Sequence, residues 1–277
     1  MSCLLMHNIA FMQTPANDPH WQLIWEDQFT DPNLSQWWKS HNSDHDGEPQ
    51  LYLNHNVWVS NGNLVIEVNN NQAIHPTTGE VKKYTSGSVG TRYEYHTRFG
   101  YIEARIKIPY KNGWGFWPAF WTWRGYTQNW TNAAEIDIFE MLGERYSSNT
   151  TTTNVHTCYP SEDPNCIKPN NFQAHILSNF DYRDWHTYAI EWNADKIIWY
   201  VDNVAIRTLK NANLDNYGNS IIDSVQIILN VAILKDYLPP TFPPFQEYMY
   251  IDYVKVYQLR CDKNSVVTKI TNFNTYD

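Results

Sequence analysis

Three carboxylic acids interrupt one apolar stretch of the chain, Ala134-Glu135-Ile136-Asp137-Ile138-Phe139-Glu140-Met141. The branched and aromatic residues of this stretch predict a β-strand. Successive side chains of a strand point to opposite faces, so Glu135 and Asp137 share one face while Glu140 falls on the other. A β-bulge, which is one extra residue near 138–139, would return Glu140 to the face of the other two acids. The spacing therefore predicts three carboxyls in a row on one face.

Such a cluster of acids indicates acid–base chemistry. Like charges repel, and the repulsion raises the pKa of at least one carboxyl. In a purely structural strand this repulsion would only destabilise the fold. A glycosidase, in contrast, needs one ionised carboxylate and a second carboxyl that keeps its proton. The alternative interpretation of the bare pattern is a solvated edge strand whose acids are there by chance.

An aromatic segment just upstream, residues 113–123, reads Gly-Trp-Gly-Phe-Trp-Pro-Ala-Phe-Trp-Thr-Trp. Alternation places Trp117 and Trp121 on one face of a strand and Phe116 and Phe120 on the other. The second face can pack in the core, while the indoles of the first can stack on sugar rings. The alternative is an aromatic cluster that lies wholly in the core. Together with the acids, this segment favours a glycan-cleaving enzyme.

With further motifs, the chain resembles glycoside hydrolase family 16, the jelly-roll endo-glycanases that include laminarinases, mixed-linkage glucanases, agarases, carrageenases and endo-β-galactosidases. The acidic spacing Glu-x-Asp-x-x-Glu is similar to that of the laminarinase, agarase and carrageenase side of the family. The plant transglycosylases and the licheninases lack the extra residue. Besides the two segments above, the resemblance rests on these motifs in chain order: Trp25-Glu26-Asp27-Gln28-Phe29, Asn61-Gly62-Asn63-Leu64, Tyr84-Thr85-Ser86-Gly87, the run from Gly100 to Pro109, Ile190-Glu191-Trp192, Trp199-Tyr200-Val201-Asp202 and the run from Ile251 to Tyr257.

The resemblance implies a fold and a reaction. The fold is all-β, a two-sheet antiparallel jelly-roll sandwich of the concanavalin A-like type with a concave substrate cleft. The reaction is endo-acting hydrolysis of a β-glycoside with retention of configuration. In this reading Glu135 is the nucleophile that forms a covalent glycosyl-enzyme, and Glu140 is the acid/base. Asp137 hydrogen-bonds Glu135 and adjusts its ionisation. Catalysis needs no cofactor.

The family pattern also implies substrate-binding residues. Trp117 would be a stacking platform beside the cleavage point, and Trp130 occupies the place of a second cleft tryptophan. His156 matches a histidine that hydrogen-bonds near the acid/base, although a polar residue satisfied within the sheet is the alternative. Weaker candidates are Trp121, Arg92, which could instead pair with Glu94 or Glu103, and Asn230, which could instead cap a sheet end.

A structural calcium ion is a further implication of the resemblance. The positions that match its ligands are Gln28, Gly62 and Asp252. Gln28 stands where the family usually has a glutamate. The change removes one negative charge from a site for a hard cation and weakens the case for calcium.

Length and charge restrict the remaining possibilities. The chain has 277 residues and a net charge of −9. This length suits one large all-β domain, which we expect at 19–260 between tails at 1–18 and 261–277. The negative charge argues against nucleic acid as a partner, because phosphate binding needs a basic surface. No apolar run reaches the length of a membrane span. We expect a monomer whose partner is a polysaccharide.

The cysteines and the first residues of the chain bear on the cellular compartment in which the protein works. Residues 1–16 contain no basic residue and so lack the positive region of a signal peptide. Polysaccharide-degrading enzymes usually work outside the cytoplasm, which predicts a secreted protein and a disulfide between Cys158 and Cys166 rather than two free thiols. Cys3 and Cys261 lie near the two ends and form a second candidate pair. No cysteine spacing indicates zinc.

Periodicity predicts strands along most of the chain and almost no helix. Loops are expected at 31–54 and 69–83, and an Asn-Gly turn is expected at residues 61–62. The predicted strands cover 21–29, 57–60, 64–68, 86–91, 98–109, 149–157, 185–192, 197–201, 204–209, 224–232 and 248–259.

The sequence leaves two classes of polysaccharide as candidate substrates. Laminarinases usually carry a Gly-Gly segment after the strand that matches 227–230, whereas residues 231–240 here read Val-Ala-Ile-Leu-Lys-Asp-Tyr-Leu-Pro-Pro. A β-1,3-glucan or a β-1,3-1,4-glucan and a β-galactan therefore both stay as candidates. Two other functions compete. A lectin on the same fold predicts loss of the acids, and a transglycosylase predicts the acidic strand without the extra residue.

Overall fold

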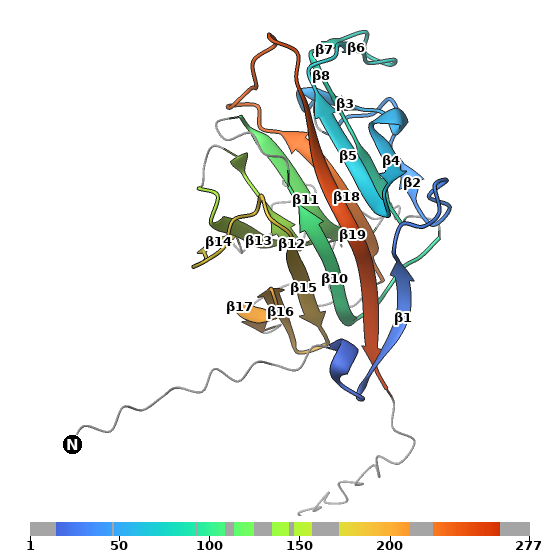
Figure 1. Ribbon diagram of the computed structural model, residues 1–277, viewed down its shortest axis with the longest axis vertical. Helices are drawn as coiled ribbons and strands as arrows, with labels where there is room; N and C mark the ends of the chain where they lie inside the picture. Colours follow the sequence, from blue (N-terminus) through green and yellow to red (C-terminus); the bar gives the residue numbers. More distant parts are fainter. Residues whose placement is uncertain are drawn as a thin grey trace, which may run out of the picture.

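The computed structural model describes residues 15–45, 47–91, 94–108, 114–124, 135–143, 147–156, 172–210 and 224–260. Within these residues two large sheets pack face to face (Figure 1). One has ten strands, with the order β17-β16-β15-β10-β19-β5-β8-β3, while β1 pairs with β19 and β4 with β5. The other has seven strands, in the order β14-β13-β12-β11-β18-β9-β2. The predicted two-sheet jelly-roll sandwich is confirmed.

The strands of the ten-stranded sheet are β1 (Trp21–Asp27), β3 (Gln50–Tyr52), β4 (Val57–Ser60), β5 (Asn63–Asn69), β8 (Tyr84–Ser86), β10 (Gly100–Lys107), β15 (His186–Trp192), β16 (Lys196–Val201), β17 (Val204–Lys210) and β19 (Gln246–Leu259). The seven-stranded sheet contains β2 (Trp38–Lys39), β9 (Ser88–Gly90), β11 (Phe116–Trp123), β12 (Glu135–Glu140), β13 (Thr150–His156), β14 (Gln173–Ile176) and β18 (Gln226–Ile233). Strands β6 (Ala73–Ile74) and β7 (Val81–Lys82) form a small hairpin. The two short 3-10 helices are η1 (Pro15–Asn17) and η2 (Asn54–Asn56).

The core lies between the two sheets and follows from strand alternation. On β10, Ile102 and Ile106 are fully buried and point toward the other sheet. Phe120 on β11 and Ile136 on β12 meet them from the seven-stranded sheet. Burial of one such side chain contributes roughly 1.5–3 kcal/mol. The inward residues of β11 and β12 therefore fix these strands in place, while their outward residues are free for chemistry.

Two tight turns form where the sequence places residues that tolerate positive φ. Asn61 and Gly62 have φ of 51° and 73°, and they join β4 to β5 as the Asn-Gly pair predicts. Asp202 and Asn203 have φ of 47° and 65° and join β16 to β17. Positive φ at both central residues is the hairpin turn that matches the twist of the flanking strands.

The strand expected at 86–91 is divided between the two sheets. Its first part belongs to β8 and its second part is β9, and Gly87 lies at the crossing. A Cβ atom at position 87 would come within 2.5 Å of Val57 Cγ2 and 2.7 Å of the Asn56 carbonyl oxygen. Only glycine permits so close an approach. Alternation along the sequence does not show which sheet a residue joins, and the prediction of one strand here was wrong.

The second difference between the structure and the prediction is a set of short strands that the sequence analysis did not predict. The expected loop at 31–54 contains β2 and β3, and the expected loop at 69–83 contains the β6–β7 hairpin. Strand β3 pairs with β8 in parallel, which is an exception to the predicted antiparallel pairing. Strand β14 was not expected. Each of these strands has two to four residues, which is too few for a period of two to become visible.

The ends of the sandwich lie close to the predicted domain boundaries. Strand β1 begins at Trp21 and β19 ends at Leu259. The tail at 261–277 and residues 1–14 lie outside the described residues, so the predicted domain limits stay predictions. The same holds for the disulfide expected between Cys158 and Cys166 and for the pair Cys3 and Cys261. Among the described residues, no helix is long and apolar enough to span a membrane.

Candidate active site

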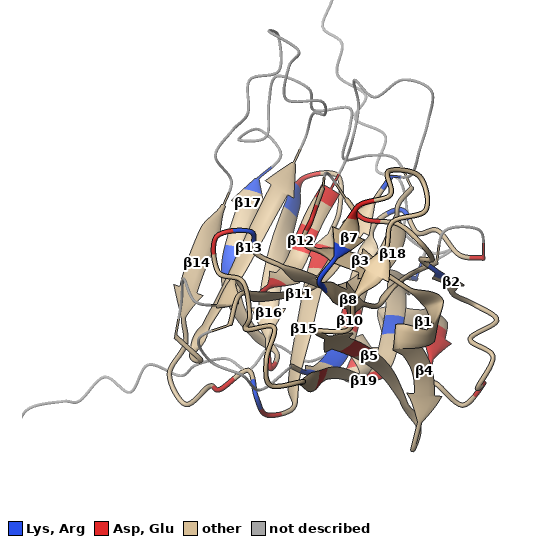
Figure 2. Ribbon diagram, turned by 90° about the horizontal axis from the view of Figure 1, so that it is seen from above, with Lys and Arg blue, Asp and Glu red and all other residues tan. Residues whose placement is uncertain are grey.

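The predicted bulge is present in β12. Asp137 lies opposite Asn154 and Glu140 lies opposite Thr152, so three steps along β12 match two steps along β13. On the other side of β12 the register with β11 shifts at the same place. Ile138 and Phe139 are both buried in the core. The extra residue returns Glu140 to the outer face of the seven-stranded sheet, where Figure 2 shows acidic residues gathered on β12.

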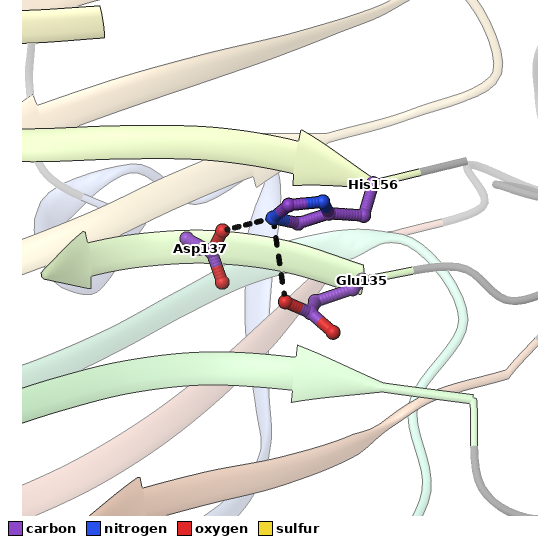
Figure 3. Close-up of side chains that lie close together, drawn as sticks. All are labelled: Glu135, Asp137 and His156. Carbon is purple, nitrogen blue, oxygen red and sulfur yellow. Dashed lines mark ion pairs between the residues drawn. The ribbon is translucent and has the colours of Figure 1, made fainter. Parts of the chain in front are cut away.

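A histidine completes the acidic group. His156 on β13 lies directly opposite Glu135 in the register. Its Nε2 atom is 3.6 Å from Glu135 Oε1 and 3.4 Å from Asp137 Oδ2 (Figure 3). The same nitrogen is 2.9 Å from Asn154 Nδ2. His156 thus lies beside two of the three acids, and it is hydrogen-bonded to Asn154 of its own strand.

Burial and mutual repulsion raise the pKa of both glutamates well above the usual value. For Glu135 the largest cause is burial, followed by the charge of Asp137 and by a hydrogen bond between these two carboxyls. For Glu140 burial is again the largest cause, followed by the charge of Asp137. Each glutamate therefore holds its proton to a higher pH than an ordinary carboxyl does.

Exposure to solvent distinguishes the two glutamates. The Glu135 side chain is 23% exposed, whereas Glu140 is 8% exposed. Glu140 is thus the more enclosed of the two carboxyls, and burial is the largest cause of the raised pKa of both.

Trp117 holds Glu140 through its indole. Trp117 is on β11, and its Nε1 donates to Glu140 Oε1 at 2.7 Å. Its ring is partly exposed, as expected for a side chain that could stack on a sugar. The donated hydrogen bond favours the charged form of Glu140 and lowers its pKa, against the larger effect of burial.

Replacing Trp117 by phenylalanine is expected to move the alkaline limb of the pH–activity profile to higher pH. The substitution keeps an aromatic ring but removes the donor, so the pKa of Glu140 should rise and the acid should hold its proton longer. The measurement is kcat/KM against pH for the wild type and W117F. An alkaline limb that moves to lower pH would contradict this assignment.

Trp121 and Asn230 lie together on the same face. The Trp121 Nε1 donates to Asn230 Oδ1 at 2.8 Å, and Trp121 is the register partner of Asp137. Asn230 is within β18 rather than at its end, and its Nδ2 donates to the Tyr52 hydroxyl at 3.1 Å. The structure thus brings together Trp117, Trp121, His156 and Asn230 around the three acids. Arg92 and Trp130 lie outside the described residues, so their roles stay predictions.

Two residues behind the acidic strand were not predicted as part of the site. Trp199, on β16 of the opposite sheet, is fully buried, and its Nε1 donates to the carbonyl oxygen of Asp137 at 2.9 Å. The guanidinium of Arg207 lies 4.5 Å from the centre of the Trp199 ring and donates to Thr153 Oγ1 at 2.9 Å. These contacts hold the backbone at the bulge. Trp199 stood out in the sequence only as part of a motif, without a sign of this contact.

One described group of side chains could geometrically hold a metal ion. It consists of Glu135, Asp137 and His156, whose ligand atoms lie within 4.8 Å of one another. A metal there would occupy the carboxyl of Glu135, the predicted nucleophile, so we derive no step through a metal.

The side chains at the predicted calcium positions do not fit a calcium ion. Asp27 lies opposite Val254 and Leu64 lies opposite Ile251, so Gln28 and Gly62 follow and precede strand residues that pair on either side of Asp252. However, Asp252 Oδ2 accepts from Arg105 at 2.8 Å, and this ion pair neutralises the carboxylate. The Gln28 amide contributes no charge and donates to Glu26 at 2.9 Å. A hard cation binds where carboxylates are available to it.

Chelation is therefore expected to leave the melting temperature unchanged within about 1 °C, because a weakly bound ion adds little stability. The measurement is thermal unfolding with EDTA and with millimolar CaCl2, with MgCl2 as the control. A fall of several degrees in EDTA that CaCl2 reverses and MgCl2 does not would restore calcium to these positions.

Comparisons with known proteins agree with this geometry. The model of glycosyl hydrolases family 16 matches residues 50–233. The chain is 29% identical over 268 residues to the clotting factor G alpha subunit of Tachypleus tridentatus, covering 93% of this chain and 37% of the relative. It is 27% identical over 266 residues to glucan endo-1,3-beta-glucosidase A1 of Niallia circulans, covering 85% of this chain and 38% of the relative. The chain thus spans less than two fifths of either of these relatives.

A solved structure supports the same relationship. The catalytic domain of an endo-1,3-beta-glucanase (laminarinase) from Thermotoga petrophila RKU-1 superposes with a TM-score of 0.74 at 30% identity, covering 87% of this chain and 98% of that domain. The family match spans the bulged strand, both neighbouring strands and the tryptophans that contact the acids. The chain belongs to glycosyl hydrolases family 16.

Proposed function

We propose that this chain is an endo-acting β-glucan hydrolase that cleaves its polymer with retention of configuration at the anomeric carbon. The observation that carries the proposal is the bulged strand β12, which presents Glu135, Asp137 and Glu140 on one face beside Trp117 and Trp121. A retaining glycosidase needs a nucleophilic carboxylate and a carboxylic acid that keeps its proton. Burial raises the pKa of Glu140 well above its usual value, as a carboxylic acid that must keep its proton requires.

In the first step Glu135 attacks the anomeric carbon and forms a covalent glycosyl-enzyme. Glu140 donates its proton to the glycosidic oxygen, so the leaving chain departs as a neutral alcohol. Trp117, which donates to Glu140 Oε1, orients the carboxyl for this transfer.

In the second step Glu140, now ionised, removes a proton from water. The water attacks the anomeric carbon from the side that the leaving chain has vacated, and the bond to Glu135 breaks. Asp137 hydrogen-bonds Glu135. The charge of Asp137 raises the pKa of Glu135, so Asp137 adjusts the ionisation of the nucleophile.

The substrate class that we propose is a β-1,3-linked glucan, with mixed β-1,3-1,4-glucan as a second substrate. The named activity of the Niallia relative and of the Thermotoga structure supports this choice over a β-galactan. The segment after β18 differs from the usual laminarinase pattern, but it packs on the strand that carries Trp117. Leu234 N donates to the Gly115 carbonyl at 2.7 Å, and Gly115 N donates to the Tyr237 carbonyl at 2.8 Å.

A polysaccharide panel tests the proposal. The chain would be incubated with laminarin, lichenan, agarose, porphyran, κ-carrageenan and mucin glycans, and the products would be sized. We expect oligosaccharides of intermediate length from laminarin. Oligosaccharides from a galactan alone would overturn the glucan assignment. Transfer to an added sugar acceptor would indicate a transglycosylase, and binding without cleavage of any polymer would indicate a lectin.

A polymer of this kind is encountered outside the cytoplasm, so we propose that the protein is secreted or extracytoplasmic. We also propose that it acts as a monomer.

A further inference from the structure

Three side-chain atoms that can bind a cation converge on the catalytic face, where β12 and β13 lie side by side. The side chains of Glu135 and Asp137 extend toward the ring of His156 (Figure 3). His156 Nε2 is 3.6 Å from Glu135 Oε1 and 3.4 Å from Asp137 Oδ2. All three atoms lie within 4.8 Å of one another. The group therefore presents one nitrogen and two carboxylate oxygens to a common point.

The nitrogen of His156 that faces the acids carries a lone pair rather than a proton. Val155 N donates to Asn154 Oδ1 at 2.9 Å, which turns the amide nitrogen of Asn154 toward His156. This amide nitrogen lies 2.9 Å from Nε2, and an NH2 group can only donate. Nε2 is therefore the acceptor. A neutral imidazole whose nitrogen accepts in this way is the form of histidine that binds metal ions.

The Asp137 carboxyl presents a buried oxygen to the same nitrogen. Asp137 is 2% exposed, and its Oδ2 accepts no hydrogen bond from the residues that the structure describes. A buried acceptor without a donor costs free energy. Because Nε2 has no proton to give, its position 3.4 Å from Oδ2 does not relieve this cost. A cation between the two atoms would relieve it.

The spacing and the types of ligand favour zinc. Zinc binds imidazole nitrogen and carboxylate oxygen at about 2.0–2.2 Å, usually in a tetrahedron, and two such ligands then lie about 3.4 Å apart. The separations of 3.6 Å and 3.4 Å from His156 Nε2 are close to this value. Calcium and magnesium prefer oxygen ligands alone. The His156 side chain is 50% exposed, so water can reach the remaining position of the tetrahedron.

We propose that Zn2+ binds to Glu135, Asp137 and His156 and inhibits the enzyme reversibly. The inhibition rests on the proposed function, because it assigns attack on the anomeric carbon to Glu135. A carboxylate that coordinates zinc has its lone pair engaged and cannot attack. The ion would also lie where the sugar must approach the nucleophile, so zinc and substrate exclude each other.

The first test measures initial rates on the glucan that the panel identifies, with and without ZnCl2. We expect submillimolar zinc to raise the apparent KM about tenfold or more while kcat stays unchanged, because the ion binds only the free enzyme. EDTA should restore the original KM. MgCl2 at the same concentration should have no effect, because the histidine nitrogen is a poor ligand for magnesium.

A second test detects the metal site without any substrate. The chain contains ten histidines, so the total amount of bound zinc does not identify a site. Co2+ takes the same ligands as zinc and absorbs strongly in the visible range when its coordination is tetrahedral. The wild type should show this absorption and lose it when zinc is added. His156→Gln and Glu135→Gln each remove one ligand and should abolish the absorption.

His75→Gln is the matched control. His75 follows β6, and its Nε2 lies 3.7 Å from Asp44 Oδ1, so it is also a histidine beside a carboxylate. It lacks the second acid that His156 has. H75Q should keep the cobalt absorption and the zinc sensitivity of the wild type.

The proposal is overturned if the wild type shows no cobalt absorption, if H156Q keeps it, or if H75Q loses it. Inhibition that lowers kcat without raising KM, or that EDTA does not reverse, would also overturn it. Thermal unfolding checks that each variant is folded, and E135Q replaces H156Q if the latter is not. If the wild type cleaves none of the polymers, the proposed function fails by itself, while the cobalt spectra still decide whether the metal site exists.

Discussion

Replacing Glu135 by alanine is expected to lower kcat by roughly 10,000-fold or more, as removal of a nucleophile does in other enzymes that form covalent intermediates. The glycosyl-enzyme cannot form without this carboxylate. The substitution also leaves a space on the side of the sugar from which Glu135 would attack. Added azide should occupy that space and restore cleavage of an activated aryl glycoside.

The configuration of the product makes this experiment specific. Azide that takes the place of Glu135 attacks from the nucleophile side, so a β-glycoside should give an α-glycosyl azide. Proton NMR of the product reports the anomeric configuration. Glu191→Ala is the control, since Glu191 lies on the other sheet and hydrogen-bonds Tyr200. Full activity of E135A without azide would remove Glu135 from the mechanism.

Replacing Glu140 by alanine is expected to slow cleavage of the polymer by about 100- to 10,000-fold, the usual contribution of a general acid–base group. The loss should be much smaller for an aryl glycoside with a good leaving group, because that leaving group needs no proton. Activity should also lose its alkaline limb, since the raised pKa of Glu140 sets that limb in the wild type. Measurement of kcat/KM against pH on both substrates tests this.

Azide again distinguishes the two acids. In E140A the glycosyl-enzyme still forms at Glu135, and azide then attacks from the opposite side. The product should be a β-glycosyl azide, of opposite configuration to the product of E135A. If both variants gave the same anomer, the assignment of nucleophile and acid/base would be wrong.

The acidic face could be predicted because one rule governs it. Side chains alternate along a strand, so Glu135 and Asp137 had to share a face, and only an extra residue could bring Glu140 to it. The bulge at Ile138 follows from the spacing of the acids and needs no information from the rest of the chain. Alternation likewise assigns Phe116 and Phe120 to the core and Trp117 to the outer face.

The supporting contacts could not be predicted in this way. Trp199 donates to the Asp137 carbonyl from the opposite sheet, and Tyr52 reaches Asn230 across two segments that are far apart in the chain. Such contacts depend on how the sheets stack, which a local pattern does not encode. Gly87 shows the same limit, because its neighbours read as one continuous strand although the chain changes sheets there.

The hydrogen bond from Trp199 to the bulge relates activity to the order in which the chain is synthesised. The three acids are complete at residue 140, but the indole that holds the Asp137 carbonyl is 62 residues away from it. The β18 strand, which pairs with β11, emerges later still. A nascent chain that stops before residue 199 therefore carries every acid but lacks this indole, and one that stops before residue 226 still lacks the β18 neighbour of β11. Recovery of activity during refolding should follow the slowest folding phase, because contacts between distant segments form late.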